Sequence, residues 1–236
     1  MLPRPLASHI VEPFAGSAAY STTFQPERVS LYEANTDVSD LWQWLITSAT
    51  ESDLLSLEKL RTPVKTDVRT FDLPSPQETL MRLTCASVMV GQLSSWLLYP
   101  QHRVDFSSLR VALPWIKSSV TVCGSDFREA ARQQGSDVVF FIDPPYLGTS
   151  GNYIDKTAKR NFGISPPDIA DFVLTLECPA IFTYGDGASE MFPQFAWKAL
   201  HTRRVPNIRA GGSVARTEHV AFVNWPHDSQ LSLDAA

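Results

Sequence analysis

One run of apolar residues in the second half of the chain is unusually continuous. Residues 138–142 read VVFFI, with no polar position between them. Such a run of β-branched and aromatic side chains is typical of a strand that is buried on both faces of a sheet. The run stops at Asp143, and the two prolines that follow cannot continue a strand because they lack a backbone N–H. The pattern therefore predicts a central strand with an acidic side chain at its carboxyl end.

Other hydrophobic segments predict that strands and helices alternate along the chain. Further strands are expected at residues 9–14, 29–32, 119–123 and 219–225, and within residues 178–187. Helices are expected at residues 37–47, 53–61, 77–98 and 128–134, and after Ser165, whose spacing to Asp168 matches a capping box. Residues 62–76 are interrupted by prolines and predict a connection, whereas residues 101–115 show no clear period.

This alternation is typical of an α/β protein with a mostly parallel sheet. In such sheets ligands bind beyond the carboxyl ends of the strands. Acidic side chains follow four of the predicted strands: Glu12, Glu33, Asp143 and Asp186. We expect these strand ends to converge on one face of the protein.

Composition and charge narrow the picture. With 236 residues and 44% hydrophobic content, the chain can fill one large core. Its three cysteines show no CxxC spacing, which indicates neither a disulfide framework nor a zinc site and favours a reducing cytoplasm. The net charge of -5 disfavours a nucleic-acid-binding surface over the whole protein but allows a local basic patch. The apolar stretch at residues 83–99 is interrupted by polar residues and is too short for a membrane span.

Two strand ends have residues suited to a nucleotide-like ligand. The segment EPFAGSAAYS, residues 12–21, places small residues where a strand turns into a helix, and Gly16 would let a ligand approach the backbone. Glu12 could accept hydrogen bonds from an ammonium group. Glu33, in YEAN, has the spacing of an acid that binds the two hydroxyls of a ribose. The alternative is that these residues serve only a tight turn and a helix N-terminus, and the two interpretations have about equal weight on these segments alone.

The tetrapeptide that ends the central strand points more strongly to chemistry. Pro144 and Pro145 fix the backbone, so that the Asp143 carboxylate and the Pro144 carbonyl form a rigid pair of acceptors suited to an NH2 group. Tyr146 adds a flat face on which a base can stack. The alternative is a proline-rich turn in which Asp143 is a cap and Tyr146 is packing.

Asp143-Pro144-Pro145-Tyr146 after an apolar strand, with EPFAGS upstream, resembles the amino-methyltransferases of nucleic acids, and most closely the DNA adenine methylase (Dam-like) family. YEAN resembles the second acidic motif of that family, and SDF, residues 125–127, resembles its segment for the cofactor adenine. FTYGDG is similar to a polar strand end of the family, and RRVPNIRAGGSVARTEHVAFVNW resembles its basic hairpin and last strands. The similarity covers roughly residues 9–61 and 119–225.

The resemblance implies a Rossmann-like methyltransferase fold with a mostly parallel seven-stranded sheet. Residues 1–61 would form its cofactor-binding part, 62–118 an inserted, mainly helical target-recognition region, 119–225 the catalytic part and 226–236 a tail. It implies methyl transfer from S-adenosylmethionine to N6 of an adenine flipped out of double-stranded DNA, with no metal and no membrane partner. The compact chain is typical of a phage or mobile element, acting as a monomer in the cytoplasm of a bacterial or phage-infected cell.

The resemblance also assigns residues to roles. Asp143, Pro144, Pro145 and Tyr146 would be catalytic. The cofactor would be bound by a longer set: Glu12, Pro13, Phe14, Ala15, Gly16, Ser17, Glu33, Ala34, Asn35, Asp126, Phe127 and Asp143. DNA contacts are expected from basic residues in two segments: Lys156, Lys159, Arg160, Arg203, Arg204, Arg209 and Arg216. The alternative for the basic residues is a solvated surface.

Two departures from the family pattern leave other functions open. The region 62–118 matches poorly and is short for target recognition, which predicts relaxed sequence specificity. The family begins with a Gly- and Lys-containing motif, for which residues 1–8 are too short, so we expect either a longer reading frame or weak cofactor binding in an open pocket. Methylation of cytosine N4 or of an RNA adenine, and a degenerate protein that binds nucleic acid without catalysis, are the alternatives.

Overall fold

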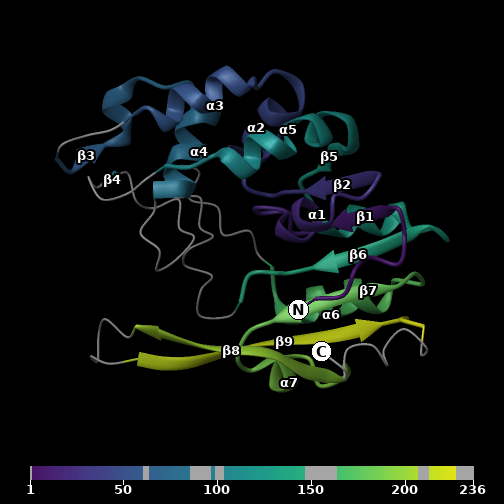
Figure 1. Cartoon of the computed structure of the whole chain (residues 1–236). Helices are drawn as coiled ribbons and strands as arrows, with labels where there is room; N and C mark the ends of the chain where they lie inside the picture. Colours follow the sequence, from purple (N-terminus) through teal and green to yellow (C-terminus); the bar gives the residue numbers. More distant parts are fainter. Residues whose placement is uncertain are drawn as a thin grey trace.

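The computed structural model describes residues 2–60, 64–85, 97–98, 104–146, 164–206 and 213–226 (Figure 1). Its main sheet has seven strands in the order β5-β2-β1-β6-β7-β9-β8. Their bounds are β1 His9–Glu12, β2 Arg28–Tyr32, β5 Val120–Gly124, β6 Val138–Ile142, β7 Ala180–Tyr184, β8 Trp197–Pro206 and β9 Ser213–Val223. The five strands from β5 to β7 are parallel, whereas β9 runs antiparallel to both β7 and β8. The protein is therefore an α/β protein with a mostly parallel sheet, as the sequence predicts.

The centre of the sheet consists of the strands with the most continuous apolar sequences. All five residues of β6 and all five of β7 are buried, because helices or other chain segments cover both faces. The register Ile10↔Val139 and Phe141↔Ile181 places these four side chains on one face. The parallel arrangement brings the carboxyl ends of β1, β2, β6 and β7 to one edge.

Helices lie on both faces of the sheet. One face is covered by α1 Ala19–Phe24 beside a helical group: α2 Thr36–Thr47, α3 Glu51–Glu58, α4 Ser75–Cys85 and α5 Ser107–Ser119. The other face packs against η2 Phe127–Gln133, α6 Pro166–Leu174 and α7 Ala188–Met191. Figure 1 shows the helical group at the β2–β5 end of the sheet and the β8–β9 hairpin at the opposite end.

The helical group has its own apolar core, to which α2, α4 and α5 contribute Leu41, Met81 and Ile116. Beside it, β3 Thr66–Asp67 pairs with β4 Leu97–Leu98, and η1 Val68–Phe71 follows β3. Among the described helices, none is long and apolar enough to cross a membrane.

Several predicted boundaries are wrong, each for a local reason. The described part of the helix predicted at residues 77–98 is α4, Leu97–Leu98 belongs to a strand, and residues 86–96 lie outside the described residues. Residues 101–115 contain most of α5, whose period is obscured by Pro114 inside the helix. The first strand ends at Glu12 rather than Phe14, because Pro13 cannot donate to a neighbouring strand.

The basic segment before the last strand is also more regular than expected. Residues 197–206 form β8, which the hydrophobic pattern does not predict, and β9 begins at Ser213 instead of His219. Two-stranded antiparallel pairing extends from Trp197↔Ala221 to Pro206↔Ser213. The last predicted strand thus forms one arm of a long hairpin.

Candidate active site

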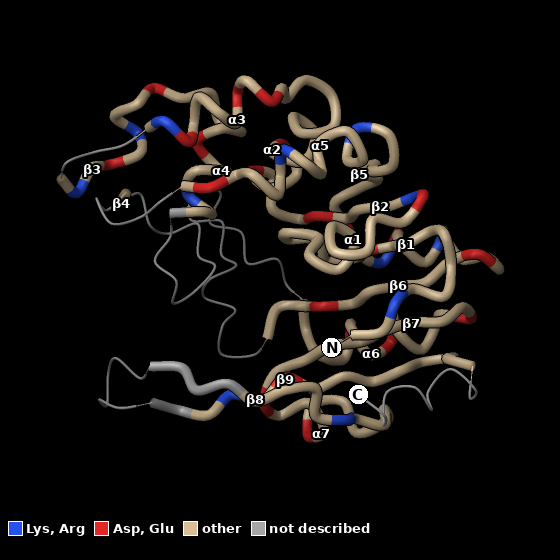
Figure 2. The backbone as a smooth tube through the Cα atoms, in the orientation of Figure 1, with Lys and Arg blue, Asp and Glu red and all other residues tan. Residues whose placement is uncertain are grey.

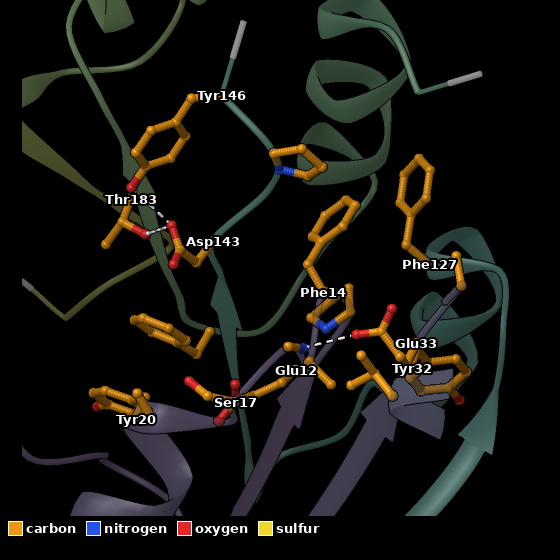
Figure 3. Close-up of a pocket in the computed structure, with 18 of the residues that line it drawn as sticks. Glu12, Phe14, Ser17, Tyr20, Tyr32, Glu33, Phe127, Asp143, Tyr146 and Thr183 are labelled. Carbon is orange, nitrogen blue, oxygen red and sulfur yellow. Dashed lines mark hydrogen bonds between the residues drawn. The ribbon is translucent and has the colours of Figure 1, made fainter. Parts of the chain in front are cut away.

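A cavity of about 830 Å³ opens at the carboxyl ends of β1, β2, β6 and β7 (Figure 3). It is lined by residues that follow three of these strands and by side chains from α1, α6 and the hairpin. The site therefore lies where a mostly parallel sheet is expected to hold a ligand.

The turn after β1 forms one wall of the cavity. Gly16 has a φ of +48°, a left-handed conformation that favours glycine, and a Cβ added there would meet nothing within 4 Å. Its amide donates to Glu33 Oε2 at 2.8 Å, and its carbonyl accepts from Trp42 Nε1 at 2.9 Å. The turn is thus held from behind and leaves open space in front of its backbone.

Two acidic side chains flank this turn. Glu12 is 1% exposed and accepts a hydrogen bond from the Ser21 amide at 2.9 Å. Burial raises the pKa of Glu12 to about 7, although the hydrogen bonds from Ser21 oppose the rise. Glu33 is half-buried and also accepts from the Asn35 amide at 2.7 Å. Burial raises the pKa of Glu33, while its backbone hydrogen bonds favour the ionised form.

An aromatic pair lies on the other side of Glu33. The rings of Phe14 and Phe127 stack with centroids 4.8 Å apart, and both line the cavity. Asp126 does not line it: its carboxylate caps η2 by accepting from the Arg128 amide at 2.9 Å and pairs with the Arg128 guanidinium. The aromatic pair offers an apolar surface for a flat ring.

Asp143 lies at the opposite end, directly after β6. Its Oδ1 accepts from Tyr146 Oη at 2.9 Å and from Thr183 Oγ1 at 3.0 Å (Figure 3). The residue is open to the cavity, but the walls shield its carboxyl group from bulk water. Burial is the main cause that raises the pKa of Asp143, and the charge of Glu218 adds a smaller contribution. The hydrogen bonds from Tyr146 and Thr183 oppose the rise.

Tyr146 is fitted closely against the end of β7. Its ring centroid is 4.9 Å from that of Tyr184, and a Cβ added to Gly185 would lie 2.8 Å from Tyr146 Cδ2. Only a residue without a side chain allows the ring this approach. Gly185 therefore positions the aromatic face beside Asp143.

The cavity is acidic. Its described lining includes four carboxylates, those of Glu12, Glu33, Asp143 and Glu218, and no lysine or arginine. Figure 2 shows acidic positions where β2 and β6 end. In the part of the chain that the structure describes, no group of three or more His, Cys, Asp or Glu residues could hold a metal ion. Such a lining favours a ligand with positive charge and hydroxyl or amino donors, and disfavours a phosphate-rich one.

The structure brings most of the predicted site residues together. The segments 12–17 and 33–35, with Phe127, Asp143, Pro145 and Tyr146, all line this cavity. Pro144 is buried behind it and is not in the described lining, and Asp186 follows β7 but is directed to the hairpin. The predicted convergence of acidic strand ends therefore holds for Glu12, Glu33 and Asp143.

The predicted DNA contacts are described only in part. Lys156, Lys159, Arg160 and Arg209 lie outside the described residues. Arg203 and Arg204 belong to β8, where Arg203 pairs with Arg216 of β9. The Arg216 side chain is 62% exposed and lies 3.2 Å from Asp186 Oδ2. Arg216 is thus accessible on the hairpin while it forms an ion pair at its base.

Sequence reasoning missed several lining residues that come from distant segments. Thr183 and Tyr184 end β7, Leu200 lies on β8 and Glu218 on β9. Leu2 also reaches the cavity, near where Pro3 accepts a hydrogen bond from Tyr20 Oη at 2.9 Å. The polar strand end at Thr183 was a usable signal, whereas no local pattern marks Glu218. No protein-family model matches the chain, and no curated protein matches it.

Proposed function

We propose that this protein is an S-adenosylmethionine-dependent methyltransferase that modifies N6 of adenine in double-stranded DNA. One observation carries the proposal. The cavity has an acidic described lining without lysine or arginine, and the same cavity holds Asp143 and Tyr146, which follow β6. A sulfonium donor is a cation with a ribose and an adenine, which suits this lining. A cofactor with a diphosphate would place its charges among four carboxylates.

The residues present fit the cofactor. Gly16 leaves open space in front of its backbone, which allows close approach of a ligand. Glu33 would accept from the ribose hydroxyls, the stacked rings of Phe14 and Phe127 would offer an apolar surface to the adenine, and Glu12 would face the cationic end. Asp126, which caps η2 and does not line the cavity, would act only by positioning the neighbouring Phe127. When bound, the cofactor supplies an electrophilic methyl group.

The sheet supports the same proposal. Five parallel strands are followed by an antiparallel β9 between β7 and edge strand β8. This order is compatible with the Rossmann-like methyltransferase fold that the resemblance to the Dam-like family implies. The catalytic tetrapeptide then lies after the fourth strand of the parallel set in chain order, beside the turn that follows β1.

The chain's own groups would position the target amino group. The resemblance assigns its two N–H bonds to Asp143 and the Pro144 carbonyl, although Pro144 lies behind the described lining, and Tyr146 would stack on the ring. This arrangement draws the nitrogen lone pair out of conjugation and directs it at the methyl carbon. Transfer would form the N–C bond as the S–C bond of the bound donor breaks, with the bonding pair kept by sulfur, and the amino group held by Asp143 would then lose one proton. Catalysis rests on positioning and electrostatics, without a covalent enzyme intermediate.

The resting geometry sets one requirement for this step. The hydroxyl groups of Tyr146 and Thr183 both donate to the same oxygen of Asp143, Oδ1. The substrate amino group must use Oδ2 or displace the tyrosine hydroxyl. A base inside a duplex cannot reach this cavity, so the target would be flipped out at a cost of a few kcal/mol.

The proposal is tested by methyl transfer from labelled S-adenosylmethionine to DNA, followed by mass spectrometry of the nucleosides. We expect label in N6-methyladenine, and none with Asp143→Ala or Asp143→Asn. Asp171→Asn, an exposed acid on α6, is the matched control and should retain activity.

Three results would each overturn a part of the proposal. Label in N4-methylcytosine would show that the target is the amino group of cytosine. Label only with RNA would show that the substrate is RNA and not DNA. Turnover of Asp143→Asn within a few-fold of the parent would remove Asp143 from the mechanism.

A further inference from the structure

An irregularity in the hairpin places His201 opposite a fourth carboxylate that lines the cavity. β8 and β9 pair regularly as far as Ala199↔His219, but the next pair is His201↔Glu218, so that Leu200 has no partner. Such a bulge changes the direction of neighbouring side chains and is common beside active sites. Both Leu200 and Glu218 line the cavity.

The sheet register shows where this carboxylate lies relative to Asp143. Thr183, which donates to Asp143, pairs with Val220, and Glu218 is two residues from Val220 and therefore on the same face of the sheet. Glu12 stands on β1 and Glu218 on β9, on opposite sides of β6 in the strand order. Asp143 is thus flanked by one carboxylate on the cofactor side and one on the hairpin side.

Glu218 is held from the solvent side. Its Oε2 lies 3.4 Å from His201 Nε2, and its side chain is 31% exposed, so the carboxylate is only partly desolvated. Its charge acts on Asp143 across the cavity, which places both groups in one electrostatic environment. The bulge aligns His201 with this carboxylate, whereas the alternation of β9 directs Glu218 to the cavity face of the sheet.

We propose that Glu218 is a catalytic residue that faces the target amino group and stabilises the positive charge arriving on its nitrogen, and that His201 is its positioning residue. The inference rests on the proposed function. During transfer the positive charge moves from sulfur, on the Glu12 side, to the amino nitrogen beside Asp143. A carboxylate beyond Asp143 is nearer to that charge after the transfer than before it, so it favours the transition state over the bound reactants. The nitrogen then gives its surplus proton to Asp143.

The test is the single-turnover rate of methyl transfer to an adenine-containing duplex, together with the calorimetric Kd of S-adenosylmethionine. Glu218→Gln should lower the rate about 10- to 100-fold, somewhat less than the loss of a fully enclosed electrostatic contact. Its cofactor Kd should change by no more than about twofold, because the residue acts on the transferred charge. Glu218→Asp should recover part of the rate, and Glu177→Gln, an exposed acid at the other end of the sheet, should match the parent.

The outcomes separate this inference from the proposed function. An active parent whose Glu218→Gln variant keeps the parent rate would overturn the catalytic role and leave the methyltransferase intact. An equal loss in Glu218→Gln and Glu218→Asp, with a lowered melting temperature, would also overturn it, because it would indicate a structural role. A parent that transfers no methyl group would overturn the proposed function, and this inference with it.

Discussion

At the scale of single residues, the site depends on how closely Tyr146 and Asp143 are held. The tyrosine donates to Asp143 and packs against Tyr184 and the backbone of Gly185. The sequence marks Asp143 and Tyr146 plainly, but the need for glycine at position 185 follows only from the approach of a ring 39 positions earlier in the chain.

Gly185→Ala should displace the Tyr146 ring, because the new Cβ would stand 2.8 Å from Cδ2 of that ring. Loss of base stacking should weaken target binding by about 1–3 kcal/mol, measured as the Kd for a duplex with an extrahelical adenine. Gly135→Ala is the control, since its Cβ would make an ordinary 3.6 Å contact with Val138. Unchanged affinity in Gly185→Ala would mean that Tyr146 does not stack on the target.

Glu12 should make both stability and cofactor binding depend on pH. Its pKa rises from 4.5 to about 7 on folding, chiefly because burial disfavours its charge. The folded state therefore holds a proton that the unfolded state has lost. The stabilisation from this group is complete below about pH 4.5 and is lost as pH rises to about 7, at up to about 1.4 kcal/mol per pH unit.

Urea unfolding between pH 5 and pH 8 would measure this dependence, and Glu12→Gln should flatten it, since glutamine can still accept from the Ser21 amide. Affinity for S-adenosylmethionine should change in the opposite direction and rise with pH through about 7, as Glu12 ionises near a cation. The same pH dependence of stability in parent and variant would assign the titration to another group.

At the scale of elements, one aspartate extends the contact between the hairpin and the sheet beyond the backbone pairing of β7 with β9. Asp186, in the loop after β7, accepts from the Thr217 amide at 2.9 Å and pairs with the Arg216 guanidinium at 3.2 Å. The hydrogen bond from the Thr217 amide is the main cause that lowers the pKa of Asp186, and the Arg216 guanidinium lowers it further. The loop after a central strand thus fixes the strand that carries Glu218.

Arg216→Gln should weaken DNA binding about equally for all sequences and reduce the slope of log K against log salt by about one, as expected for one phosphate contact. Asp186→Asn should strengthen DNA binding and increase this slope. Asparagine keeps an acceptor for the Thr217 amide, but it no longer neutralises the charge of Arg216. Binding titrations over a range of salt would test both variants. If Arg216→Gln lost affinity for a single sequence only, the hairpin would read bases.

Elements also show where local patterns mislead. Pro114 suggests a break, yet α5 continues to Ser119 because its apolar side contacts the core of the helical group. Residues 197–206 alternate poorly and carry several charges, yet they form β8 because β9 provides a complete set of backbone partners. In both cases tertiary contacts outweigh local propensity.

At the scale of the whole molecule, the acidic cavity and the net charge of -5 leave few surfaces that attract DNA. A small recognition region can reach few base edges in the major groove. Sequencing of methylated adenines should therefore reveal a site of roughly two to four bases, or a mere preference. A strict six-base site would contradict this and would assign base recognition to elements outside residues 62–118.

The amino-acid pattern is enough to predict the order of the parallel strands along the chain, the buried β6 and the acidic residues at three strand ends. Those features depend on local runs of apolar residues and on prolines, which end a strand at their own position in the sequence. That Thr183 donates to Asp143, that Gly185 lies against Tyr146 and that Glu218 lines the same cavity follows only from the folded chain. These contacts depend on the sheet order and on the register between β7 and β9, and the pairing of Glu218 with His201 depends on the bulge at Leu200; all of these are set by residues far apart in the chain.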